Sequence, residues 1–76
     1  MDDKDVDARL IRIIAAQWYP VSWHTLRSVD VQPYPGPAAA LRALFAKGLV
    51  EEVPAHPHPR YRVSARGAKL VEPRQA

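Results

Sequence analysis

The sequence predicts a small α+β domain, in which three helices are followed by a β-hairpin and a short last helix. Two observations support this class. Apolar residues recur at helical spacing in the first half of the chain, and the stretch RYRVSA in the second half alternates as a strand does. Proline and glycine residues separate these stretches. The expected domain covers residues 6–72, with an acidic tail at 1–5 and a second tail at 73–76.

The first helix is expected in the stretch VDARLIRIIAAQWYP. Apolar residues recur there every three to four positions, which predicts one helix face directed to the core. These residues are Val6, Leu10, Ile13 or Ile14, and Trp18. Pro20 is expected to stop the helix, because proline has no N–H to donate and its ring clashes with the preceding turn.

The second helix is expected to be short, within PVSWHTLRSV, with Ser22 as its cap. The third helix is marked more clearly, in GPAAALRALFAKGLV. Gly36 stands at its cap and Pro37 at its first position, where the missing N–H is not needed. Gly48 is expected to end it in the left-handed conformation that glycine adopts easily.

The faces of the third helix follow from its apolar residues. Leu41, Leu44 and Phe45 are expected on the core side. The residues expected to point outward are Ala38, Ala39, Arg42 and Ala43. The outer face of this helix is therefore smooth, with a single strong polar group.

A β-hairpin is expected from LVEEV and RYRVSA, which a proline-rich loop joins. In the second strand Tyr61 alternates with Arg60 and Arg62, so the two arginines are expected on its outer face. Ser64 is expected to cap a last short helix, ARGAKLV, which Pro73 closes.

Charge is unevenly distributed along the chain, whose formal net charge is +3. Residues 1–40 carry four lysines and arginines against five aspartates, and residues 41–76 carry seven against three glutamates. Binding to a polyanion is therefore expected in the second half. The acidic start of the chain and the lack of an apolar run of membrane-spanning length predict a cytoplasmic protein without membrane contact.

The sequence gives no indication of enzymatic activity. It has no cysteine, which excludes a disulfide or a thiolate zinc site, and it has neither a nucleophile elbow nor a phosphate-binding loop. His24 has no Ser-His-Asp pattern around it. His56 and His58 lie beside prolines without a third ligand nearby. We expect no catalytic residues, no metal and no cofactor.

The order of these elements resembles a winged helix-turn-helix domain, and in particular bacterial regulators of the MarR and PadR type. Two phrases carry the resemblance, the end of the third helix with its Gly-Leu-Val and the serine, glycine and leucine after the second strand. The matching positions are Leu44, Lys47, Gly48, Leu49, Val50, Ser64, Gly67 and Leu70. The resemblance covers about residues 6–71. It implies a double-stranded DNA-binding protein, either a transcriptional regulator or an accessory recombination factor. Those regulators usually add long dimerisation helices, for which this chain has no room, so a monomer or a small dimer contact is expected.

In a winged helix-turn-helix domain the third helix enters the major groove. An alanine there can contact only a thymine methyl group, so few bases can be distinguished. Contacts with phosphates and with the minor groove, made by the arginines of the wing, are expected instead. The residues proposed to touch DNA are Ser22, His24 and Thr25, then Tyr34, Ala38, Ala39 and Arg42, and finally His58, Arg60 and Arg62.

Two alternatives remain open. Arg60 and Arg62 also fit the solvated side of an edge strand. A second function class is a protein-interaction module, in which Ala38, Ala39 and Ala43 pack against a partner or a second copy, because alanine methyl groups cost little to desolvate.

The aromatic residues Trp18, Tyr19 and Trp23 cluster near the first corner of the chain. Such a cluster usually belongs to the core. In so small a domain, however, Trp18 and Trp23 do not both fit inside easily, and one of them is a candidate for a partner surface.

Overall fold

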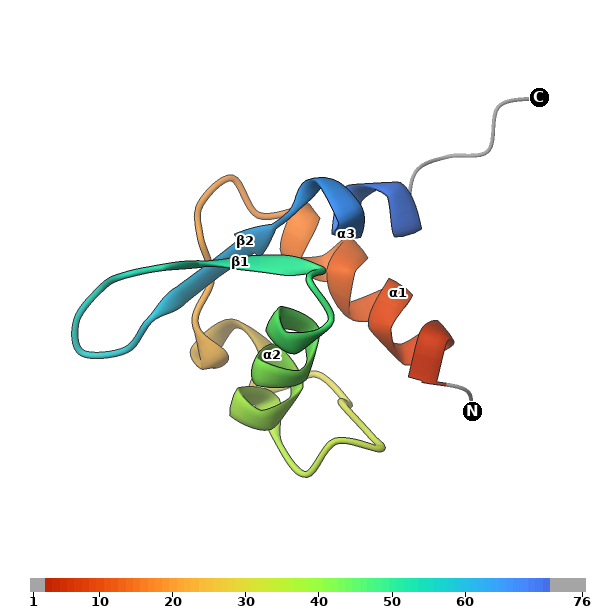
Figure 1. Cartoon of the computed structure of the whole chain (residues 1–76). Coiled ribbons are helices and arrows are strands. Elements are labelled where there is room, and N and C mark those ends of the chain that lie inside the picture. Colours follow the sequence, from red (N-terminus) through yellow and green to blue (C-terminus); the bar gives the residue numbers. More distant parts are fainter. Residues whose placement is uncertain (1–2, 72–76) are drawn as a thin grey trace.

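The computed structural model describes residues 3–71, which form an α+β domain, as predicted (Figure 1). The elements in chain order are α1 (Asp3–Ala15), the 3-10 helix η1 (Trp23–Leu26), α2 (Pro37–Ala46), β1 (Val50–Val53), β2 (Arg60–Val63) and α3 (Ala65–Leu70). β1 and β2 form an antiparallel hairpin, and α2 lies beneath it in Figure 1. α1 and α3 lie at the opposite end from the hairpin loop.

The ends of the domain differ from the expected limits. α1 begins at Asp3, so residues 3–5 of the expected acidic tail are helical. The expected tail at 73–76 and the role of Pro73 lie outside the described residues. Within residues 3–71, no helix combines the length and the apolar character needed to cross a membrane.

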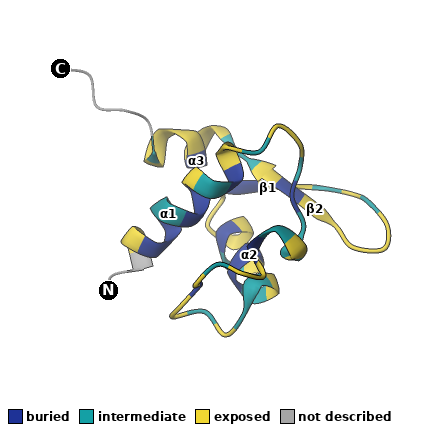
Figure 2. Cartoon of the chain, turned by 180° about the vertical axis from the view of Figure 1, so that it is seen from behind, coloured by how far each residue is buried: buried dark blue, intermediate teal, exposed yellow. Residues whose placement is uncertain are grey.

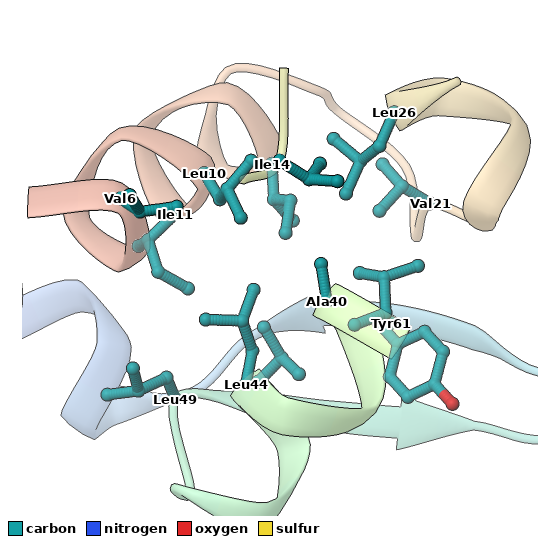
Figure 3. Packing of buried hydrophobic residues seen from close by; sticks show 13 residues of the cluster. Val6, Leu10, Ile11, Ile14, Val21, Leu26, Ala40, Leu44, Leu49 and Tyr61 are labelled. Carbon is teal, nitrogen blue, oxygen red and sulfur yellow. The ribbon is translucent and has the colours of Figure 1, made fainter. Parts of the chain in front are cut away.

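A single apolar core connects the helices to the hairpin. α1 buries Val6, Leu10, Ile11 and Ile14, whose side chains point toward α2 and the sheet (Figure 3). Figure 2 shows the same division from behind, with buried residues on the inner faces and exposed residues along the hairpin loop. Burial of these aliphatic groups is the main favourable contribution to folding in a chain that has no cysteine.

The first helix is shorter than predicted, and Trp18 is not part of the core. α1 ends at Ala15, well before Pro20, and Trp18 is 92% exposed. The reason lies in the next segment. Val21 exchanges two backbone hydrogen bonds with Tyr61 of β2, at 2.8 and 2.7 Å. A helix continued to Trp18 would carry the chain away from this partner, so the helix ends early and its apolar stripe ends with it.

The second helix is a 3-10 turn of four residues rather than an α-helix. Ser22 stands at its N-cap, but its hydroxyl makes no capping hydrogen bond; the Ser22 carbonyl instead accepts from the Thr25 N–H at 3.1 Å. The expected hydroxyl cap at Ser22 is therefore wrong. Leu26 is fully buried and anchors the turn to the core.

The predicted start and stop of α2 are confirmed. Gly36 is its N-cap with Pro37 in the first turn, and Gly48 has a φ of 75°. The N–H of Gly48 bonds to the carbonyl of Phe45, and the N–H of Leu49 to that of Leu44, both at 2.9 Å. This paired arrangement satisfies carbonyls that the last turn of a helix leaves open.

The expected core position of Phe45 is wrong. Its side chain is 46% exposed, whereas Ala40, Leu41 and Leu44 are buried. These three residues lie within one face of the helix, and Phe45 lies on the flank beside it. The flank faces the hairpin, where Phe45 meets the ring of Tyr61 edge-on at 6.2 Å.

The hairpin has the predicted strands and faces. Val50 pairs with Val63 and Val53 with Arg60, and the Val21 bridge adds a short third partner on the other side of β2. Tyr61 is buried, whereas Arg60 and Arg62 are exposed. The register is fixed because a slip by one residue would expose Tyr61 and bury an arginine.

Four residues join the end of α2 to the start of α3, and we call them the α2–α3 junction: Gly48, Leu49, Ser64 and Gly67. The Ser64 hydroxyl accepts from the Gly67 N–H at 3.1 Å, as predicted for a cap, and donates to the Gly48 carbonyl. The Ser64 N–H bonds to the Leu49 carbonyl at 3.1 Å. Gly67 packs so closely that a Cβ atom there would lie 2.0 Å from the Leu49 carbonyl oxygen.

We predict that Gly67→Ala destabilises the fold, because the added methyl group meets backbone that cannot give way. The expected loss is roughly 1–3 kcal/mol in the free energy of unfolding, typical of overpacking. Gly36→Ala is the matched control, because nothing lies within 4 Å of the point that its Cβ atom would occupy and its backbone is extended. Urea denaturation of both variants measures the effect. Equal stabilities would contradict the role of the junction.

Candidate nucleic-acid interface

A hollow lies between α2, η1 and the hairpin, and we call it the α2–hairpin hollow. α2 contributes Ala38, Arg42 and Phe45 to its lining. Glu52, His58 and Tyr61 come from the hairpin, and Trp23 comes from η1. The elements meet here because Leu26, Leu41 and Tyr61 share the core beneath. Of the residues predicted to touch DNA, Ala38, Arg42 and His58 line the hollow.

Arg42, in the hollow, and Arg60, on the opposite face of β2 from Tyr61, are two cations near the hollow. Both side chains are exposed, and neither takes part in the salt bridges formed within the described residues. Arg42 lines the hollow from α2, and Arg60 lies at the loop end of β2, between two residues of the lining. Both arginines are thus open to solvent, and their contact with a polyanion stays a prediction.

Arg62, the other predicted wing arginine, has a partner on the neighbouring strand. Its Nε donates to Glu51 Oε1 at 3.0 Å, in the register that places the two residues opposite each other. Their side chains are 66% and 54% exposed. An ion pair so open to water contributes little stability, so it reduces the local positive charge without holding Arg62 firmly.

Tyr34 is not free to bind a phosphate, contrary to the prediction. Its hydroxyl donates to Asp7 Oδ1 at 2.6 Å. Lys47 Nζ donates to Asp7 Oδ2 at 2.6 Å and to the Tyr34 oxygen at 3.0 Å. Asp7 is only 3% exposed, so a buried carboxylate here requires both donors. We call these three residues the Asp7 network.

The pKa values of two members reflect the Asp7 network. The pKa of Lys47 is raised, because its ammonium donates to the Asp7 carboxylate and to Tyr34. The pKa of Tyr34 is raised as well, first by burial and then by its hydrogen bond to Asp7. Lys47 therefore stays charged, but Asp7 neutralises that charge within the protein. The network also links α1 to the end of α2.

The predicted site residues in η1 and at its N-cap differ in their exposure to solvent. Ser22 and Thr25 are half-buried, and His24 is exposed. The His24 ring stacks on Trp23 with centroids 3.8 Å apart, and the His58 ring from the hairpin loop lies 6.3 Å from His24 and 6.1 Å from Trp23. The structure thus brings together two predicted site residues that are far apart in the sequence, His24 and His58.

The alanines of α2 are less uniform than predicted. Ala38 is exposed and lines the hollow. Ala39 and Ala43 are half-buried, and Ala43 also reaches the hollow. None of them offers a hydrogen bond, so the helix face toward the hollow has Arg42 as its only charged group.

Phe45, Glu52 and Tyr61 line the hollow but are not among the predicted site residues, and Trp23 is predicted only as a candidate for a partner surface. Phe45 shares a stripe with Ala38 and Arg42, at the helical spacing of seven and three residues, and this spacing is a signal that could have placed it there. Glu52 stands opposite Tyr61 in the hairpin and so shares its face. The pKa of Tyr61 is raised, chiefly by burial and also by the charge of Glu52.

The chemistry of the hollow favours a planar, mostly apolar group. Its walls carry rings and alanine methyl groups, its charges are one arginine and one glutamate, and further cations stand outside it. Within the described part of the chain, no three His, Asp or Glu side chains gather in a way that could hold a metal ion.

Comparisons of this chain with protein-family models, with curated proteins and with solved structures find no match. A function therefore has to be inferred from the chemistry of the molecular surface, above all from the face around the α2–hairpin hollow.

Proposed function

We propose that this chain is a small winged-helix protein that binds double-stranded DNA through the face formed by η1, α2 and the hairpin. Its element order and the position of the hairpin beside α2 are compatible with a winged helix (Figure 1). In that fold α2 is the helix presented to the major groove, and the hairpin is the wing. The observation that carries the proposal is that Arg42, in the hollow, and Arg60, at the loop end of β2, are both exposed and take part in no salt bridge among the described residues.

Phosphate contacts supply most of the affinity in this proposal. A phosphate can be neutralised by Arg42 and by Arg60. Arg62 can do the same when its exposed ion pair with Glu51 breaks. The alanines allow α2 to approach the duplex closely but distinguish few bases. Such a protein suits transcriptional regulation or an accessory role in recombination, in which DNA shape and position matter more than a long recognition sequence.

The first test of DNA binding is its dependence on salt. We predict binding of a labelled generic duplex with a log–log salt slope of about −2 to −3, because each neutralised phosphate contributes about −0.9. Arg42→Ala and Arg60→Ala should each make the slope shallower by about one phosphate contact. Fluorescence anisotropy across a salt series measures both quantities. Arg12→Ala is the matched control, because Arg12 is an exposed arginine of α1 and forms no part of the hollow.

An equal loss in all three variants would show that binding is unspecific attraction to net charge. No binding even at low salt would refute the proposal.

A second test uses the Arg62–Glu51 pair. We predict that Glu51→Gln tightens binding to duplex about threefold at low salt, because it removes a negative charge and releases Arg62 for phosphate. The free energy of unfolding should change by less than about 0.5 kcal/mol, since the pair is exposed. Anisotropy titration and urea denaturation give the two values. The gain should shrink in the double variant Glu51→Gln/Arg62→Ala; a full gain there would mean that Arg62 is not involved.

A protein-interaction module is the second candidate function. The observation that favours it is the apolar part of the α2 surface, where Phe45 is 46% exposed and Ala38 is exposed in the lining of the hollow. A partner or second copy could cover this surface through Ala38, Ala39 and Ala43.

The two candidates respond differently to Ala38→Gln, which adds length but no charge. We predict that binding to duplex weakens by no more than about threefold, because Ala38 contributes only close approach, whereas the arginine–phosphate contacts supply most of the affinity. A helix-to-helix protein contact at this position would lose its close packing and weaken more than tenfold. Sedimentation equilibrium and anisotropy on the same samples separate the cases. Concentration-dependent self-association that disappears in this variant, with no duplex binding in either protein, would favour the interaction module.

A further inference from the structure

We propose that the α2–hairpin hollow accepts an unpaired DNA base, so that this protein prefers DNA with unstacked bases over fully paired duplex. This inference rests on the proposed DNA-binding function and specifies its substrate.

The first argument is the lack of groups that recognise base edges. A paired duplex offers its sequence as hydrogen-bonding edges in the grooves, which Arg, Lys, Asn and Gln side chains contact. Toward the hollow, α2 offers Ala38, Ala43 and one such residue, Arg42. A face of this composition gains little specificity from the major groove of paired DNA.

The second argument is the presence of rings. Phe45 is 46% exposed, Trp23 is half-buried, and both line the hollow together with Tyr61 and His58. Phe45 and Tyr61 meet edge-on at 6.2 Å, and Trp23 meets His58 edge-on at 6.1 Å. Aromatic side chains stack on the faces of unpaired bases. A base within a duplex has both faces covered by its neighbours, so only an unpaired base can use these rings.

The third argument is the placement of charge. Arg42 and Glu52 both line the hollow, and their opposite charges make its interior a poor site for a phosphate. A carboxylate can instead accept a hydrogen bond from an exocyclic amino group of a base, as it does from cytosine. Arg60, which is exposed on β2 outside the lining, and the exposed Arg42 side chain remain for the phosphates on either side. The base would lie inside and the backbone outside.

The experiment compares three labelled oligonucleotides of the same sequence at one salt concentration: a duplex, the duplex with a central three-base mismatch, and the single strand. We expect the mismatched duplex to bind about tenfold more tightly than the paired one, the effect of one stacked base. Phe45→Ala should remove this preference, so that the ratio of the affinities for mismatched and paired duplex falls to about one. Phe45 is half exposed, so the variant should fold, which circular dichroism checks.

The matched control is Leu70→Ala, which removes another exposed apolar side chain, 39% exposed on α3 and outside the hollow. It should keep the preference.

Tryptophan fluorescence gives an independent signal. In a Trp18→Phe background, Trp23 is the single tryptophan. Mismatched DNA should quench its emission through a nearby base, and paired DNA should quench it much less.

The outcomes separate the two proposals. Equal affinities for paired and mismatched duplex would overturn the unpaired-base inference and leave the DNA-binding proposal intact. A preference that survives Phe45→Ala would also overturn it, because the base would then lie elsewhere. Binding to none of the three oligonucleotides would overturn both proposals.

Discussion

The position of the candidate interface depends on one close backbone contact, that of the Leu49 carbonyl with Gly67. Because Gly67 has no side chain, α3 can lie against the residue that follows α2, and Ser64 fastens both through its hydroxyl and its N–H. β1 begins directly after Leu49 and β2 ends directly before Ser64. The same contact therefore sets the direction in which the hairpin leaves the core. That direction in turn determines the width of the α2–hairpin hollow, since α2 is its other wall.

The Asp7 network supports the same geometry from the side of α1. Its buried carboxylate, that of Asp7, binds the end of α2 through Lys47. This occupies Lys47 and Tyr34, two groups that could otherwise bind a phosphate. The Arg62–Glu51 pair reduces the available charge further. The positive net charge of the second half of the sequence is therefore larger than the positive charge available to a ligand, and the ring-lined hollow becomes the more distinctive feature.

Local signals predicted the fold well, because they act within a few residues. The caps of α2, the left-handed Gly48, the Ser64 cap and the alternation around Tyr61 all depend on near neighbours. Two of the errors, at Trp18 and Tyr34, arose where contacts between distant parts of the sequence decide the structure. Trp18 lies outside the core because the chain turns so that Val21 can pair with β2. The Tyr34 hydroxyl is hydrogen-bonded to Asp7, 27 residues away in the sequence. The rings of the hollow come from three separate segments, so no single stretch of sequence could show that they meet.

The hairpin also affects the tendency of this protein to aggregate through its strand edges. A two-stranded sheet has two free edges, and each is a template on which another chain can add a strand. Here the short Val21 segment occupies the edge of β2. The remaining edge, that of β1, is only four residues long, exposes Glu51 and Glu52, and is followed by Pro54, which has no N–H to donate. Aggregation by strand addition is thereby discouraged in a small domain whose apolar rings remain open to a ligand.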